Sequence, residues 1–227
     1  MIFGKRPTAS AAETKGAQKP PGGGAPQNRI SLAASQFVAL LMQNYKDANG
    51  VHAETIIGAA AAVAGDAVKD ASGLPVYDAQ FVVTRESEDL LVGERGSGLA
   101  LIAAAVGNAG GDPRSLPSGR ALLARMAAAV GGPSYPPLSV DRSHYPHEYS
   151  PQAATRFRAK VCVICAAQGI VDPKEIFVTC ALATAMLIAV TAKTLDPVVA
   201  GTLALEIMFG VSRMNRAALD GLSRENA

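Results

Sequence analysis

The chain has 227 residues, enough for one substantial domain, and its formal net charge at pH 7 is +2. The charge is unevenly placed, because residues 1–29 hold five basic residues and one acidic residue, which leaves residues 30–227 at a net −2. A nucleic-acid-binding domain needs a basic face to meet phosphates, so we expect no nucleic-acid partner. Alanine supplies much of the 49 % hydrophobic content and tryptophan is absent, which favours a helical core with close helix–helix contacts.

Residues 1–29 are rich in Gly, Pro, Ala and Lys, with the run Pro-Pro-Gly-Gly-Gly at 20–24. Such a segment cannot bury enough apolar surface to offset the entropy lost on ordering. The sequence therefore predicts a disordered basic tail at 1–29, followed by a single helical domain at 30–227. The first residues show no apolar run of signal-peptide length, so we expect a cytoplasmic protein.

Two helices are expected after the tail. The first begins at Ser31, a good N-cap residue, and shows apolar residues at helical spacing as far as Tyr45. It should end at Asn49-Gly50, because these residues tolerate the left-handed backbone of a helix C-terminus. The second helix covers about 53–70 and is filled with Ala, Ile and Val. Its two glycines, Gly58 and Gly65, lie near one face and would permit close packing against a neighbour.

Two short β-prone runs follow, at 81–84 and 90–92, separated by charged residues. They predict one β-hairpin at about 80–93, the single sheet that we expect in the chain. Because an isolated hairpin is only marginally stable, it should pack on helices or pair with a second copy. The glycine-rich stretch 93–98 matches neither the Walker nor the G-x-G-x-x-G pattern, and so predicts a turn into a helix at 99–108 rather than a phosphate loop.

The middle of the chain predicts a short helix that begins at Asp112-Pro113 or at Ser118 and stops at the Gly-Gly-Pro of 131–133. Residues 133–150 contain four prolines, three tyrosines and two of the three histidines, and they predict a long irregular loop. Loops of this length are uncommon unless they are functional or packed as a compact surface segment. Helix resumes at Ser150-Pro151 and continues to Gly169.

The stretch 176–192 carries no charged residue, and a helix that is apolar all round is buried in a domain or in a bilayer. Asp172-Pro173 supplies its N-cap and first residue, and Asp196-Pro197 opens a second apolar helix in the same way. The short connection makes these helices antiparallel neighbours. The sequence thus predicts a mainly α fold of six or seven helices around a central apolar helix at about 173–193.

A soluble core explains this helix better than a membrane span. At about 1.5 Å per residue, 176–192 covers about 25 Å, less than the roughly 30 Å of hydrocarbon in a bilayer. The following helix contains Glu206, which would be costly inside lipid. The amphipathic helices upstream also need a central helix to pack on, so we expect no membrane partner.

One set of residues could bind a metal ion. His144 and His147, followed by Cys162 and Cys165, have the two-residue spacings of a Cys₂His₂ zinc site. Pro146 separates the histidines, however, and the cysteines lie in an apolar helical run. Since a free cysteine behaves as a small hydrophobe, we interpret Cys162 and Cys165 as core residues and expect no metal and no cofactor. Three cysteines without regular spacing also do not predict a disulfide framework.

His52 and Glu54 could pair for acid–base chemistry at the start of the second helix. No nucleophile motif accompanies them, and a first-turn Glu commonly complements the helix dipole. We therefore assign no catalytic residue and favour a non-catalytic protein over an enzyme.

Two functions remain open. The first is an interaction or structural protein that self-associates, most simply as a dimer, through Ala/Gly-rich helical surfaces; a different protein partner is also compatible with such surfaces. The alternative is a binding protein for a small apolar ligand, or an enzyme, with a pocket lined by the 133–150 loop. Loops on rigid scaffolds often carry function, and this loop concentrates tyrosines and histidines.

Overall fold

Helices account for nearly all regular structure in the part of the chain that the computed structural model describes, residues 26–73, 84–127, 137–148, 150–217 and 220. This confirms the predicted mainly α fold. The α-helices are α1 (Pro26–Asn44), α2 (Ala53–Ala71), α3 (Arg85–Val92), α4 (Gly98–Asn108), α5 (Gly119–Ala127), α6 (Ser150–Ala167), α7 (Pro173–Thr191) and α8 (Pro197–Arg213). Short 3₁₀ turns lie at Pro113–Ser115 and Arg142–His144. Strands β1 (Lys46–Asp47) and β2 (Gly50–Val51) form an antiparallel hairpin.

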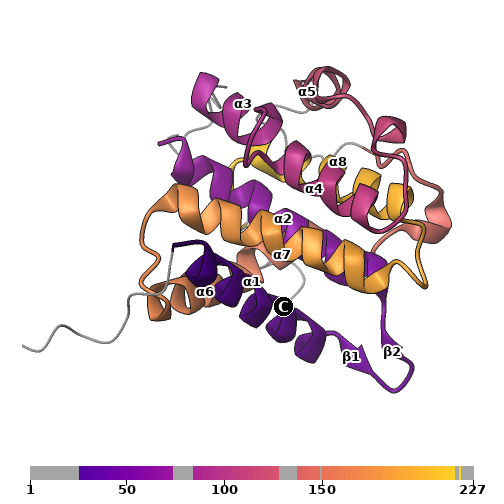
Figure 1. The fold of residues 1–227 in the computed structure, drawn as a ribbon, viewed down its shortest axis with the longest axis horizontal. Helices are drawn as coiled ribbons and strands as arrows, with labels where there is room; N and C mark the ends of the chain where they lie inside the picture. Colours follow the sequence, from indigo (N-terminus) through magenta and orange to yellow (C-terminus); the bar gives the residue numbers. More distant parts are fainter. Residues whose placement is uncertain (1–25, 74–83, 128–136, 149, 218–219, 221–227) are drawn as a thin grey trace, which may run out of the picture.

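The other helices pack around α7, as predicted (Figure 1). α7 lies on α2 and is flanked by α1 and α4, while α6 and α8 cover other sides of α2. α3 packs on α4, and α5 packs on α8. Burial is most complete in α2, where every residue from Glu54 to Lys69 is buried. The core therefore holds two adjacent central helices, α2 and α7.

Glycine allows α2 to approach its neighbours closely. A Cβ atom at Gly65 would lie 2.3 Å from the carbonyl oxygen of Met208 in α8, and one at Gly58 would lie 2.9 Å from Oγ of Ser150. Real Cβ atoms do not reach 2.3 Å from a backbone oxygen, so the α2–α8 distance requires glycine at 65. The predicted close packing at these two glycines is confirmed.

The predicted helix starts are confirmed where a capping side chain is present. The carboxylate of Asp172 accepts the backbone N–H of Lys174 at 3.0 Å, and that of Asp196 accepts the N–H of Val198 at 2.7 Å. Both alternatives weighed for the middle of the chain occur. Asp112 caps the short 3₁₀ turn, and the Ser118 hydroxyl accepts the N–H of Ala121 at the start of α5.

The predicted hairpin at 80–93 is wrong. Residues 85–92 form α3, while 81–83 lie outside the described residues. The Thr84 hydroxyl accepts the N–H of Ser87 and caps the helix. Ser87 and Leu91, four residues apart, are both buried on one face of the helix, so the charged segment is amphipathic helix rather than a loop between strands.

The observed hairpin lies instead after α1, where Asn49-Gly50 was expected to end a helix. Lys46 pairs with Val51 and Asp47 with Gly50, and Gly50 has a φ of 110°. α1 itself ends at Asn44. Asn-Gly favours φ > 0 in tight hairpin turns as well as at helix ends, so the local signal was recognised but assigned to the wrong structure.

α1 also begins five residues earlier than expected, at Pro26. Residues 26–29 of the predicted tail therefore belong to the domain, and residues 1–25 lie outside the described residues. Arg29 explains the extension, because its Nη1 donates to the carbonyl of Gly169 at 3.1 Å and its Nη2 lies 3.9 Å from Glu175. These contacts to Gly169 and to the first turn of α7 stabilise the first turn of α1.

Among the described helices, α7 alone is long and apolar enough to cross a membrane, and 56 % of its apolar stretch is buried against other helices. The core helix of a soluble protein meets the same criteria, so the helix is compatible with a soluble protein. The carboxylate of Glu206 in α8 also has an ion-pair partner and hydrogen-bond donors within the protein. It pairs with Arg125 and accepts the backbone N–H and the hydroxyl of Ser139 at 2.7 and 2.6 Å.

Candidate functional site

All three histidines of the chain lie at the N-terminal turn of α2. The rings of His52 and His147 are stacked, with centroids 3.6 Å apart. Glu54 places one carboxylate oxygen 2.9 Å from Nδ1 of His144 and the other 3.4 Å from Nε2 of His52. The Thr55 hydroxyl accepts the backbone N–H of His147 at 2.9 Å. The sequence predicted that His52 and Glu54 are close together. It did not predict that His144 and His147, about 90 residues farther along the chain, lie beside them.

Burial and the neighbouring charges set the protonation of this cluster. Burial lowers the pKa of His52; Glu54 opposes this effect and His147 adds to it. Burial also opposes ionisation of Glu54, but the hydrogen bond with His144 and the nearby imidazoles outweigh it and hold the pKa of Glu54 below its usual range. Glu54 is therefore an ionised acceptor at neutral pH, and it joins the segment 137–148 to α2.

A cavity of about 210 Å³ lies beside the histidines. Its lining residues all carry polar or charged groups and are Tyr45, Asp47, His52, Thr55, His147 and Glu148. The Tyr45 hydroxyl donates to Glu148, and Nη2 of Arg156 donates to the same carboxylate at 2.9 Å. Burial, together with Glu148, raises the pKa of Tyr45 well above its usual value. Two residues of the 133–150 segment, His147 and Glu148, line this pocket, and several of its polar groups are already paired with one another.

The proposed zinc ligands are not brought together. His144 and His147 lie at the start of α2, whereas Cys162 lies beside Asp66, twelve residues or about 18 Å farther along that helix. Among the described residues, no group of three or more His, Cys, Asp or Glu side chains is placed to hold a metal ion.

The interpretation of both cysteines as core residues is right for Cys165 and wrong for Cys162. Cys165 is buried, and burial raises its pKa to about 11. Cys162 is exposed. The core face of α6 holds Phe157, Val161 and Cys165, four residues apart, and Cys162 is rotated about 100° from Val161 towards solvent.

A buried ionic network joins the C-terminal half of α2 to α6 and to the segment after α8. Asp66, 1 % exposed, accepts from Lys69 at 3.0 Å, from Arg158 at 2.6 Å and from Arg216 at 2.8 Å. Arg216 also forms a two-pronged pair with Asp70, at 2.9 and 2.7 Å. Burial opposes ionisation of Asp66, but the three cations outweigh it and hold its pKa well below the usual range.

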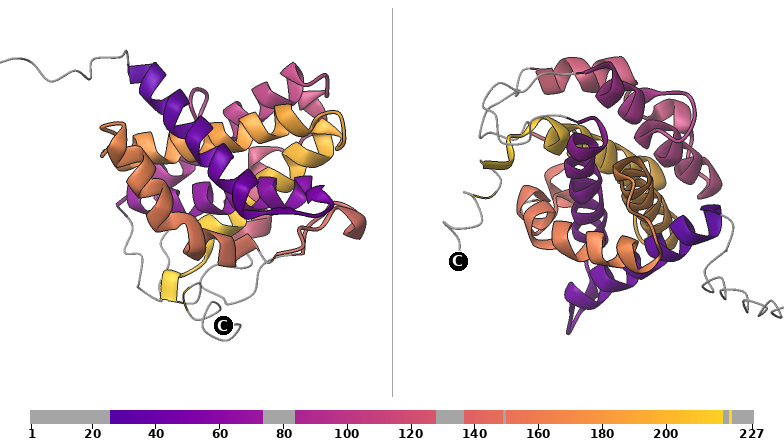
Figure 2. Two further views of the ribbon diagram at one scale, coloured as in Figure 1. Left: turned by 90° about the horizontal axis from the view of Figure 1, so that it is seen from below. Right: turned by 90° about the vertical axis from the view of Figure 1, so that its left-hand side faces the viewer.

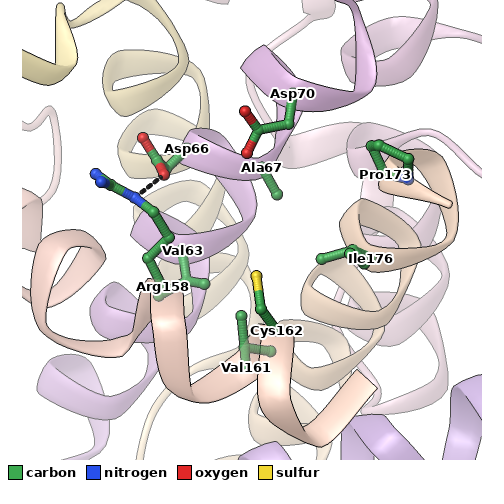
Figure 3. A pocket seen from close by; sticks show the side chains of 9 residues that line it. All are labelled: Val63, Asp66, Ala67, Asp70, Arg158, Val161, Cys162, Pro173 and Ile176. Carbon is green, nitrogen blue, oxygen red and sulfur yellow. Dashed lines mark hydrogen bonds and ion pairs between the residues drawn. The ribbon is translucent and has the colours of Figure 1, made fainter. Parts of the chain in front are cut away.

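Beside this network lies a second cavity, of about 170 Å³, between α2, α6 and α7 (Figure 3). Its wall is mainly apolar and includes Val63, Ala67, Val161, Pro173 and Ile176. Asp66, Asp70 and Arg158 lie along one edge, and the sulfur of Cys162 points into the cavity. Sequence reasoning missed this site because three separate helices form it, and the only local signal was a cysteine pair assigned to the core.

A third feature is a surface that we call the uncharged face, formed by the outer sides of α1, α7 and α4. The segments 30–45, 98–111 and 176–192 contain no Asp, Glu, Lys, Arg or His. α7 lies between α1 and α4, so these segments are neighbours (Figure 2). Leu32 and Val190 are 48 % and 60 % exposed on this surface. Partly buried apolar residues also recur along α7, at Val178, Leu182 and Met186.

Comparison with protein-family models, with curated proteins and with solved structures finds no match for this chain.

Proposed function

We propose that the protein is a non-catalytic interaction protein that self-associates as a dimer through the uncharged face. The observation that carries the proposal is the lack of charge over the segments 30–45, 98–111 and 176–192 of three adjacent helices, including their solvent-exposed positions. The charged residues of α1 and α7, Arg29, Lys174 and Glu175, lie in the first turns of these helices. The exposed positions within these three segments hold Ser, Gln, Asn, Gly, Ala, Leu, Met and Val. Depletion of charged residues is the compositional mark of an interface core. Two copies joined through this face would bury no unpaired charge.

The size of the face fits a second copy of the chain. α7 has 19 residues and is therefore about 28 Å long. Neighbouring helices lie about 8–10 Å apart, so three of them with their side chains are about 25 Å wide. α1 also has 19 residues but α4 has only 11, so the mean helix length is about 24 Å and the face covers about 600 Å². This area is at the lower end of the roughly 600–1,000 Å² that each partner contributes to a specific interface.

The cytoplasm is the compartment that we propose for this dimer. The three cysteines, Cys162, Cys165 and Cys180, are free thiols. Free thiols suit a reducing compartment, whereas small secreted domains commonly use cysteines in disulfides.

A pair of matched substitutions tests the dimer. Val190→Lys places a charge on the uncharged face, while Val163→Lys places the same charge on α6, where Val163 is 69 % exposed. We expect wild type and Val163→Lys to sediment as dimers over a concentration series. Val190→Lys should dimerise at least about tenfold more weakly, because a lysine ammonium would be desolvated without a partner.

Two outcomes would overturn this proposal. One is a wild-type protein that stays monomeric at every concentration, and the other is equal dimerisation of the two lysine variants. If the protein is monomeric and sediments with neutral phosphatidylcholine vesicles, the uncharged face binds a lipid surface rather than a second copy of the chain. Circular dichroism of both variants checks that neither substitution unfolds the domain.

A further inference from the structure

The cavity between α2, α6 and α7 has the size and lining of a small-molecule site. Its volume of about 170 Å³ is comparable to that of an engineered apolar cavity of about 150 Å³ that holds benzene. Aliphatic side chains from three helices form most of its wall. The exposed side chain of Cys162 lies in that wall, so a molecule can reach the cavity from solvent.

The charged groups at its edge already have partners. Asp66 is bonded to Lys69, Arg158 and Arg216, and Asp70 is bonded to Arg216. Nη2 of Arg158 is buried without a hydrogen-bond partner, but Figure 3 shows the guanidinium directed towards Asp66 and away from Cys162 and Ile176. A charged ligand would therefore lose water without finding a free counter-charge in the cavity.

The thiol in the wall is also uncharged at neutral pH. Although Cys162 is exposed as a residue, partial burial of its side chain raises the pKa of the thiol above its ordinary value, and the nearby Asp70 carboxylate adds to this effect. A neutral thiol is a soft, weakly polar group that packs against apolar and aromatic surfaces. All the groups that face the centre of the cavity are thus apolar or weakly polar.

We propose that this cavity is a binding site for a small, uncharged and mainly apolar molecule, about the size of a substituted benzene. The site differs from the uncharged face, because most of its wall comes from α2 and α6, and α7 contributes only Pro173 and Ile176 at its N-terminal end. It also differs from the pocket expected from sequence, because none of its lining residues belongs to the 133–150 loop.

Fluorobenzene is a suitable probe, with benzoate and benzylammonium as charged counterparts of similar shape. Cys162 supplies an internal reporter, because Cys165 and Cys180 are buried and a neutral maleimide should modify Cys162 alone in the folded protein. We expect fluorobenzene to slow this modification at least about fivefold near saturation, in proportion to the occupied fraction of sites. The charged counterparts should leave the rate unchanged.

A cavity-filling variant gives a second, independent readout. Ala67 is 8 % exposed and lines the cavity, so the larger side chain of Ala67→Leu should occupy the space that the probe needs. Ala159→Leu, at an exposed position of α6, is the matched control. In ¹⁹F NMR, the fluorobenzene signal should shift and broaden with wild type and Ala159→Leu, and should stay as in buffer with Ala67→Leu.

The proposal is overturned if fluorobenzene leaves both the maleimide rate and its own ¹⁹F signal unchanged with wild-type protein. Equal protection by benzoate or benzylammonium would also contradict it, because the ligand would then be charged. If Ala67→Leu does not fold, the effect of fluorobenzene on maleimide modification of Cys162 in the wild-type protein still tests the proposal. Val190→Lys should bind the probe as wild type does, so this result is independent of dimerisation.

Discussion

Replacing Asp66 with Asn is expected to lower the free energy of unfolding by about 3–5 kcal/mol at neutral pH. The substitution keeps the size of the side chain and one acceptor oxygen but removes the charge that Lys69, Arg158 and Arg216 surround. Lys69 is fully buried, so its ammonium would be left without a full counter-charge in a region of low dielectric. Urea unfolding of the two proteins measures the difference.

Asp70→Asn is the matched control. Asp70 belongs to the same network, but its side chain is 48 % exposed, and among the cations of the described residues it pairs only with Arg216. Water can solvate the groups around position 70 after the carboxylate is removed. We therefore expect the free energy of unfolding to fall by at most about 1 kcal/mol. Equal losses for Asp66→Asn and Asp70→Asn would show that burial of the network contributes little to stability.

The Asp66 contribution should also depend on pH in a defined direction. Because its pKa is depressed in the folded protein, the stabilisation is complete above the ordinary pKa of aspartate, about 3.9. It is lost as the pH falls from there through the depressed folded value. The difference in stability between wild type and Asp66→Asn should therefore be constant between about pH 5 and 7 and shrink below about pH 4.

Leu187→Ala tests the position of α7 at the centre of the fold. Leu187 is fully buried near the middle of the C-terminal half of α7. Truncation of the side chain removes apolar contacts and leaves a cavity. It should therefore lower the free energy of unfolding by about 2–5 kcal/mol. Leu123→Ala, at a partly buried position of α5, provides a comparison on a peripheral helix and should cost less.

Unfolding in urea without detergent distinguishes a helix α7 in a water-soluble core from a helix α7 that faces lipid. A loss below about 1 kcal/mol for Leu187→Ala would contradict its place in a water-soluble core, because lipid can fill the space beside a membrane-facing residue but nothing fills it in a packed interior. Recovery of the wild type only from membranes would contradict it as well.

Local sequence signals were sufficient for the helix starts at Asp172 and Asp196 and for the apolar character of 176–192. A capping carboxylate acts on backbone N–H groups within one turn, so its effect can be recognised without knowing the fold. The same reasoning failed at 85–92, where the predicted charged loop and the β-prone run 90–92 together form α3. There the Thr84 cap and the burial of Leu91 against the core outweigh weak strand propensities.

The candidate sites depend on contacts that no local pattern contains. Asp66 and Arg216 are 150 residues apart, and Glu54 and His144 are 90 apart. The chargeless segments 30–45, 98–111 and 176–192 are visible in the sequence, but only packing shows that they lie side by side. Composition and periodicity determined the mainly α fold and the apolar helix at its centre, but not the helix α3. The tertiary structure decided which side chains meet, because burial and ion pairing act between surfaces that the chain brings together only when it folds.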